Sequence, residues 1–264
     1  MPLFVRSIHP TPIVGYAQKD ANASGNTMMA PTFLSVGSET GCTLADVTVT
    51  GYSAPVLVDE DEGEYDGGCL GGQFILSLLT SSGTYEARYY WIDDGEIGPG
   101  WFSTGGGKAI QGGASSVSLP AGQAVWVLGN GMKLQSAGAV NEFDVAKKTN
   151  SSGNSAVGNT MPINLTLGQL TVTGYSAPVL VDEDEGEYDG GCLGGQFIVS
   201  YLTSNGTYAA RYYWIDDGEI GPGWYSTGGG KAIEGVASSV AFNAGQGVWV
   251  LGNGMYLNIP APEL

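Results

Sequence analysis

The chain has 264 residues, 26 of them acidic and 9 basic, which gives a formal net charge of −17 at neutral pH. Such an acidic surface has few cations to displace the counterions of phosphates, so we expect neither nucleic-acid binding nor attraction to an anionic membrane. Hydrophobic residues make up 42% and 44 residues are glycine, which favours short strands and tight turns over disorder, and no apolar run is long enough to predict a membrane span.

The first expected element is an N-terminal extension over residues 1–20, MPLFVRSIHPTPIVGYAQKD, which has no counterpart later in the sequence. Its prolines at positions 2, 10 and 12 interrupt the apolar patch, so no secretion signal is recognisable. We expect this extension to be an arm that docks on a neighbouring subunit.

After the extension, the sequence is a tandem duplication. The segment VDEDEGEYDGGCLGGQF occurs at Val58–Phe74 and again, unchanged, 123 residues later. The longer stretch Thr48–Met132 matches its second copy with eleven differences, and all six tryptophans pair up between the copies. The pattern predicts a first domain over 21–136 and a second over 137–264, whose polar start, rich in Gly and Ser, serves as the linker.

The residue pattern of each copy predicts an all-β fold. In the second copy, Phe197–Thr203 and Thr207–Trp214 are β-branched or aromatic runs joined by Ser-Asn-Gly, which favours a hairpin. Gly247–Ile259 repeats this arrangement, with Asn253-Gly254 at the turn. No stretch sustains the apolar spacing of a helix beyond two turns. We therefore predict two tandem, near-identical β-sandwich or small-barrel domains of a jelly-roll-like kind.

The most distinctive feature of each copy is an acidic, glycine-rich segment. It contains six carboxylates within eight residues, and carboxylate oxygens are ligands that calcium prefers. The calcium ligands predicted on this basis are Asp59, Glu60, Asp61, Glu62, Glu64 and Asp66 in the first copy and Asp182, Glu183, Asp184, Glu185, Glu187 and Asp189 in the second. The spacing does not fit an EF-hand loop, and a solvated acidic loop that keeps the protein soluble is the other open interpretation. A second acidic turn, DDGE, begins at Asp93 and Asp216 and adds ligands if the fold brings it close.

Catalytic chemistry has little support in the sequence. His9 is the only histidine and lies outside the duplication, which excludes a Ser-His-Asp triad or a His-based zinc site within each copy. The GGGK segment at Gly105–Lys108 lacks the first glycine and the hydroxyl residue of a phosphate loop. Crowded loop carboxylates are poor candidates for a glycosidase pair, which needs two carboxyls at a fixed separation. We therefore expect a protein that is not an enzyme.

The three cysteines do not form a metal or redox motif. Cys69 and Cys192 occupy equivalent positions, whereas Cys42 aligns near Leu165. The second copy therefore has one cysteine and no internal disulfide. Small buried thiols and a cross-link between copies or chains are the two interpretations, of which the first is favoured.

Aromatic side chains are the remaining candidates for ligand or subunit contacts. Trp126 and Trp249 stand within apolar VWVL runs and are expected in the core. The GPGW turns are expected to be more exposed, and rings there suit sugar stacking or subunit contacts. The predicted contact residues are Trp101, Phe102, Trp224 and Tyr225.

The order of motifs in the second copy, VGNTMPINLTLGQLTV, YYWIDDG, GPGWYSTGGGKAI and AFNAGQGVWVLG, resembles β-rich domains of uncharacterised bacterial surface and phage-associated structural proteins. In those domains a GN-x-x-P start, a central aromatic-Trp pair, a GW-[YF] turn and a closing G-x-G-[FVL]-[WF]-V strand recur in this order. The first copy lacks the GN-x-x-P element. The resemblance implies a fold and an assembly role and names no active site.

Repetition benefits an assembly or a binding surface more than it benefits an active site. We therefore expect a structural protein that self-assembles through its duplicated domains or joins other structural subunits, in a virion, a surface layer or an extracellular filament. The alternative is a calcium-dependent carbohydrate-binding protein with two equivalent glycan sites, each made by the acidic segment and the GPGW turn.

Overall fold

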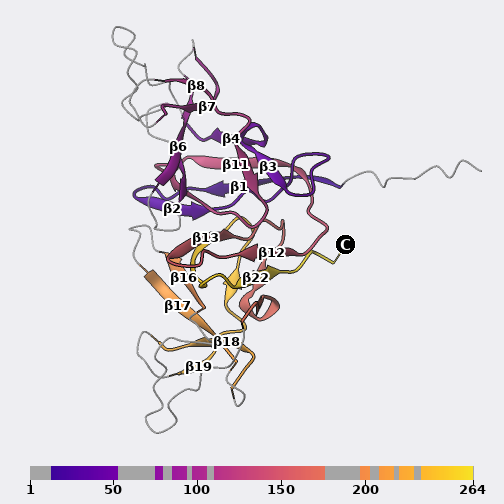
Figure 1. The fold of residues 1–264 in the computed structure, drawn as a ribbon. Coiled ribbons are helices and arrows are strands. Elements are labelled where there is room, and N and C mark those ends of the chain that lie inside the picture. Colours follow the sequence, from indigo (N-terminus) through magenta and orange to yellow (C-terminus); the bar gives the residue numbers. More distant parts are fainter. Residues whose placement is uncertain are drawn as a thin grey trace, which may run out of the picture.

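A computed structural model of the chain describes residues 13–52, 75–79, 85–93, 97–105, 110–175, 197–202, 208–216, 220–228 and 233–263. These residues form two similar halves built from antiparallel strands, with two short 3₁₀ helices and no α-helix among them. The predicted all-β, tandem β-sandwich fold is confirmed (Figure 1).

The described residues of the first half form three sheets. Its elements are β1 (Val14–Asp20), β2 (Asn26–Met29), β3 (Gly41–Thr43), η1 (Leu44–Asp46), β4 (Val47–Thr50), β5 (Ile75–Leu79), β6 (Tyr85–Ile92), β7 (Gly100–Ser103), β8 (Gly112–Gly113), β9 (Ser118–Pro120), β10 (Val125–Leu128) and β11 (Lys133–Ala139). The strand orders are β1-β11-β4, β2-β10-β5-β6-β7-β8 and β3-β9.

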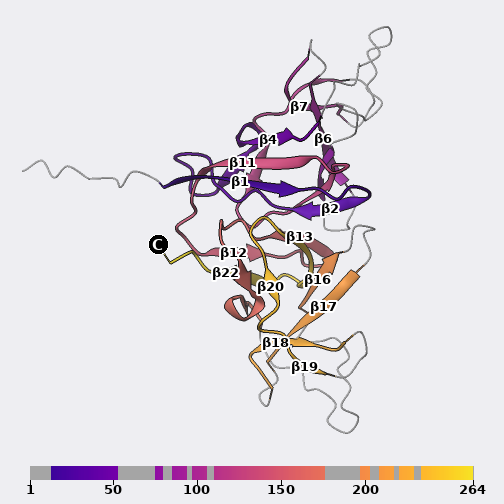
Figure 2. The same cartoon turned by 180° about the vertical axis from the view of Figure 1, so that it is seen from behind.

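The second half repeats these sheets. Its elements are β12 (Val145–Lys148), β13 (Asn154–Gly158), β14 (Leu165–Thr166), η2 (Leu167–Gln169), β15 (Thr171–Thr173), β16 (Ile198–Leu202), β17 (Tyr208–Ile215), β18 (Gly223–Ser226), β19 (Gly235–Val236), β20 (Ala241–Phe242), β21 (Gly247–Leu251) and β22 (Tyr256–Ile259). The orders are β12-β22-β15, β13-β21-β16-β17-β18-β19 and β14-β20. Figures 1 and 2 agree that β7 lies at one end of the molecule and β18 and β19 at the other, and Figure 1 shows β8 next to β7.

The structure places part of the expected extension inside the first half. Val14–Asp20 is β1, which pairs with β11 just as β12 pairs with β22 in the second half. β11 also continues to Ala139, beyond the predicted domain end at 136. The equivalence of β1 and β12 is not visible in the sequence, because an edge strand needs only backbone pairing and alternating side-chain burial, which many different sequences provide. Residues 1–12 lie outside the described part of the chain, so the arm remains a prediction.

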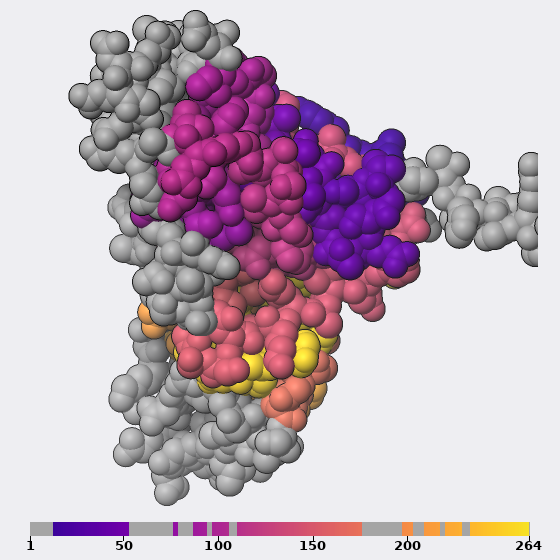
Figure 3. Space-filling model, turned by 45° about the horizontal axis from the view of Figure 1, so that its top comes forward, coloured from indigo at the N-terminus to yellow at the C-terminus, as the bar shows by residue number. Residues whose placement is uncertain are grey.

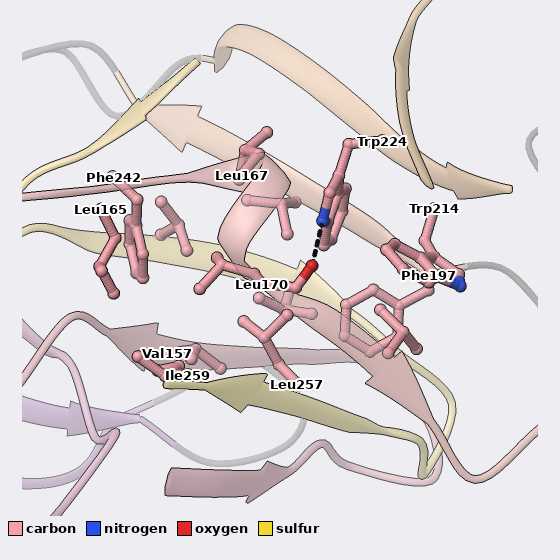
Figure 4. Close-up of a cluster of buried hydrophobic side chains, with 14 of the residues drawn as sticks. Val157, Leu165, Leu167, Leu170, Phe197, Trp214, Trp224, Phe242, Leu257 and Ile259 are labelled. Carbon is pink, nitrogen blue, oxygen red and sulfur yellow. Dashed lines mark hydrogen bonds between the residues drawn. The ribbon is translucent and has the colours of Figure 1, made fainter. Parts of the chain in front are cut away.

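Each half has its own apolar core between its large and small sheets. In the second half, Trp224 lies at the centre, and its indole N–H donates a 2.9 Å hydrogen bond to the Leu170 carbonyl (Figure 4). Phe197 and Trp214 pack edge-on against Trp224, with ring centroids 6.0 and 5.4 Å away. Trp101 makes the equivalent bond to the Val47 carbonyl, at 2.7 Å, in the first half.

The Asn-Gly turn at Asn253-Gly254 has the predicted conformation, but the two strands that it joins do not pair with each other. Both residues have positive φ, 47° and 84°, as a type I′ turn requires. However, β21 pairs with β13 and β16, whereas β22 pairs with β12 and β15. The predicted hairpin over Gly247–Ile259 is therefore wrong: the chain crosses there from the large sheet to the small one.

Among the described residues, no helix is long and apolar enough to cross a membrane.

Candidate functional site at the interface between the two halves

The two halves contact each other through equivalent residues. The Ala30 N–H donates to the Gly245 carbonyl at 2.9 Å, and in the reverse direction the Gly158 N–H donates to the Gly122 carbonyl at 3.0 Å. Gly122 and Gly245 are equivalent positions. Ala30 and Gly158 are equivalent too, because each comes directly after a residue, Met29 or Val157, that pairs with the first valine of a VWV segment. Such reciprocal contacts define an isologous interface around a pseudo-twofold axis. Figure 3 shows the two halves in contact along this boundary.

Two further bridges obey the same symmetry. Met29 forms an isolated antiparallel bridge with Gln246, and Val157 forms one with Gln123. Gln123 and Gln246 are again equivalent residues. The edges of the two large sheets, β2 and β13, therefore lie at the interface, where the partner half covers backbone groups that an edge strand otherwise leaves unpaired.

The centre of the interface is apolar. Trp126 and Trp249 lie with ring centroids 6.1 Å apart, next to the buried side chains of Met28 and Ala156. Our placement of both tryptophans in the cores was wrong. Successive strand residues point to opposite faces, so the inward direction of Val125 and Val127 turns Trp126 towards the other half. This alternation within VWVL was the signal available in the sequence.

Small residues allow the close approach at this interface. A Cβ atom on Gly247 would lie 2.8 Å from the Ala124 Cβ, well inside the normal contact distance. A Cβ on Gly158 would likewise overlap Ala30. Ala124 and Gly247 are equivalent positions, so the interface holds one methyl group where two would collide.

The symmetry breaks at two lysines that reach across the interface. Lys19 and Lys147 are equivalent in register and lie over the equivalent glycines Gly245 and Gly122. Lys147 Nζ donates a 2.9 Å hydrogen bond to Gln123 Oε1, whereas Lys19 makes no hydrogen bond or ion pair within the described residues. Burial lowers the pKa of both ammonium groups, and the neighbouring Asp20 partly offsets this for Lys19.

A single residue difference explains this asymmetry. In the second half, Gln246 Oε1 accepts a 2.9 Å hydrogen bond from the Asn243 N–H. The equivalent residue in the first half is Pro120, which has no N–H, so Gln123 Oε1 is available to Lys147. Gln246 Oε1 is already engaged on the other side, and Lys19 faces a pocket instead.

The pocket has a volume of about 200 Å³ and is formed by both halves. Among the described residues, its walls carry one cation, several amides and a small apolar area, and no carboxylate. The lining residues are Lys19, Asn22, Asn26, Thr27 and Met28 from the first half and Leu202, Asn243, Gln246 and Gly247 from the second. This composition suits a small polar ligand.

The predicted exposure of the GPGW tryptophans is wrong. Trp101 is 3% exposed and Trp224 is 1% exposed, because both rings fill the cores and satisfy their N–H groups there. Phe102 and Tyr225, the next residues, are half-buried. A ligand or subunit contact at these two rings remains a prediction.

The twelve predicted calcium ligands, from Asp59 to Asp66 and from Asp182 to Asp189, lie outside the described residues. Within the described part, no group of three or more His, Cys, Asp or Glu side chains is arranged to hold a metal. Of the two DDGE turns, Asp93 accepts a 2.8 Å hydrogen bond from the Tyr52 hydroxyl, and Asp216 accepts one of 2.9 Å from Tyr175. The fold therefore ties the first residue of each DDGE turn to an equivalent tyrosine, Tyr52 in the first half and Tyr175 in the second.

The described cysteine, Cys42, is a buried free thiol, as favoured from the sequence. Burial, with a smaller effect from Asp46, raises the pKa of this thiol to about 12. A thiol of this kind is chemically inert at neutral pH and acts as a small apolar core residue. Cys69 and Cys192 lie outside the described residues.

No protein-family model, curated protein or solved structure matches the chain.

Proposed function

We propose that this chain is a non-enzymatic structural protein that assembles end to end, as a component of a virion, a surface layer or an extracellular filament. The observation that supports this proposal is the pseudo-twofold pairing of the two copies through equivalent residues. An isologous contact uses the same surface on both copies and leaves neither of these surfaces free. The remaining surfaces of the two copies then face outward, and each has an equivalent on the other copy. A block with two equivalent ends propagates when its ends bind those of further chains.

The proposed contact surfaces are the terminal strands of the two large sheets. Strand β8 lies at one end and β19 at the other, and all four of their residues are exposed (Figure 1). No described strand pairs with the outer side of either one. An unpaired edge offers backbone N–H and carbonyl groups to another chain, and the 66% exposed Val236 adds apolar area at the β19 end.

The experiment places a lysine on each edge, since charge on an edge strand opposes pairing. Gly113 and Val236 are equivalent, and a Cβ on Gly113 meets no atom within 4 Å, so Gly113→Lys and Val236→Lys leave each half intact. We expect light scattering after size exclusion, with negative-stain imaging, to show long assemblies for the unmodified chain. Each single variant should stop at dimers, and the double variant should be a monomer.

The matched control is Val36→Lys, because Val36 is 65% exposed and belongs to a turn rather than to either edge strand. This variant should assemble like the unmodified chain. Undiminished assembly of the double variant would contradict the proposed contact, and a monomeric unmodified chain at high concentration would contradict the structural role.

Repeating these measurements with calcium and with a chelator tests the acidic segments separately. Loss of assembly in chelator would make them a calcium-dependent part of the contact. The alternative function, calcium-dependent carbohydrate binding, remains a prediction that a glycan screen in calcium addresses.

A further inference from the structure

We propose that the pocket between the halves binds a small carboxylate that also carries hydroxyl groups, such as a single sugar acid. The pocket, about 200 Å³ in volume, lies below the usual size of sites for drug-like ligands, which limits the ligand to a compact molecule. This site is independent of the sheet edges used for assembly.

Within the described residues, the cation of the pocket has no partner, and this favours a negatively charged ligand. Lys19 is half-buried and makes no hydrogen bond or ion pair within the described residues, although its twin Lys147 has one with Gln123. The adjacent carboxylate of Asp20 instead pairs with Lys133 at 3.6 Å. A carboxylate in the pocket supplies the missing partner through a charge-assisted hydrogen bond.

The amides of the pocket favour a hydroxylated body for the ligand. The side-chain amides of Asn26 and Asn243 and the Gln246 NH₂ group make no hydrogen bond within the described part of the chain. The two asparagine side chains each offer a donor and an acceptor, and Gln246 offers a donor, so hydroxyl groups can match them in both roles. Met28 and Leu202 supply the small apolar area that a sugar ring covers.

One wall of the pocket is pre-formed. Asn22 donates through Nδ2 to the Asn26 carbonyl at 2.8 Å, and its own N–H donates to Thr27 Oγ1 at 2.8 Å. Asn150 makes the same two bonds in the second half, so this turn is a feature of the fold. A pre-formed wall reduces the entropy lost on binding.

The first test is calorimetry on the full chain with four probes: glucuronate, glucose, acetate and inorganic phosphate. We expect one glucuronate per chain, and at least roughly tenfold weaker binding of glucose, which lacks the charge, and of acetate, which lacks the hydroxyls. Absence of glucuronate binding overturns the proposal. Phosphate or acetate binding as tight as glucuronate overturns the proposed ligand class.

The second test locates the site with equivalent substitutions. Lys19→Met should weaken glucuronate binding roughly ten- to hundredfold, while Lys147→Met, the matched control, should leave it unchanged. Asn243→Pro installs the residue that the fold accepts at position 120, and it frees Gln246 Oε1 to bind Lys19. This variant should therefore weaken binding while keeping the melting temperature. Equal losses in the two lysine variants, or unchanged binding in both Lys19→Met and Asn243→Pro, overturn the site.

Discussion

The two halves share one architecture, and the differences between them are most informative where they meet. Near a twofold axis, a residue packs against the equivalent residue of the other half. A side chain that fits there in one half therefore does not always fit when both halves carry it. Ala124 opposite Gly247 is one case, since a second methyl group would collide. Pro120 and Asn243 are another, because only one of them offers an N–H to the neighbouring glutamine. Duplication thus gave a symmetric frame, and single substitutions near the axis made its two sides chemically distinct.

The two cores differ in the sizes of the side chains at equivalent positions. The cross-strand pair Cys42–Leu119 in the first half is Leu165–Phe242 in the second. Both changes enlarge the second core, and part of this volume is offset where Met29 of the first half is replaced by Val157. All of these side chains are buried. Cores of this kind tolerate several substitutions when the total volume is nearly conserved.

The largest predicted effect is a loss of stability, and it tests whether the tryptophan at the centre of each core has the same role in both halves. Trp101→Ala and Trp224→Ala each remove a buried ring and its hydrogen bond to a carbonyl. We expect each to lower the free energy of unfolding by about 3–5 kcal/mol, measured by urea denaturation followed by circular dichroism. A loss below about 1 kcal/mol in either half would mean that its ring is not a core residue.

The next effect concerns the single methyl group at the interface. Gly247→Ala should destabilise the chain by about 1–3 kcal/mol through overpacking against Ala124. Ala124→Gly alone should cost about 0.4–1 kcal/mol through added flexibility of the unfolded chain. The Met28 main-chain carbon and Cβ also lie 3.0 Å from the added methyl group, so the double variant should recover the part of the loss that Ala124 causes, and its total loss should be smaller than the sum of the two single losses. Simple addition of the two losses in urea denaturation would contradict the packing described.

The smallest predicted effect distinguishes the halves by pH. Burial acts to raise the pKa of Asp46, but hydrogen bonds from Ser35 and Thr43 lower it overall, whereas the equivalent Gln169 does not titrate. With a lowered folded-state pKa, Asp46 stabilises the first half above its unfolded pKa and loses this contribution as the pH falls through the folded value. Asp46→Gln should remove this acid-dependent loss, worth less than about 1 kcal/mol after solvent screening.

The measurement is urea denaturation of the original chain and of Asp46→Gln at neutral pH and at about pH 3, below the ordinary Asp pKa. The stability difference between the two proteins should change with pH in the direction given. A difference that stays constant would show that the Asp46 hydrogen bonds are equally strong in both charge states.

The sequence predicted the class of fold and its duplication well, because both depend on local signals. Asn253-Gly254 marks its turn, and the run of aromatic and β-branched residues after Thr207 marks its strand. The pairing of strands was harder to predict. Whether the chain continues into the same sheet after Asn253-Gly254 depends on contacts with β12 and β15, which are distant in the sequence.

The candidate site could not be read from the sequence in the same way. Lys19 and Asn243 come from different halves, and nothing local joins them. The exposure of Trp101 was misjudged because glycine and proline before it indicate a turn, whereas the ring itself points back into the core. The alternation of VWVL predicts that Trp126 points away from the core of its own half. That the other half packs against this face is seen only in the structure.

The central claim is that the halves pair through equivalent backbone groups, and residue-resolved hydrogen exchange tests it most directly. Within the described residues, the amide protons of Ala30 and Gly158 donate across the interface, and the measurement uses the Gly113→Lys, Val236→Lys double variant, which is expected to be a monomer. We predict that both exchange as slowly as the Leu44 amide, which is bonded to Val117 within the first half. Exchange of Ala30 and Gly158 at the rate of exposed amides, with Leu44 still protected, would contradict the pairing of the two halves.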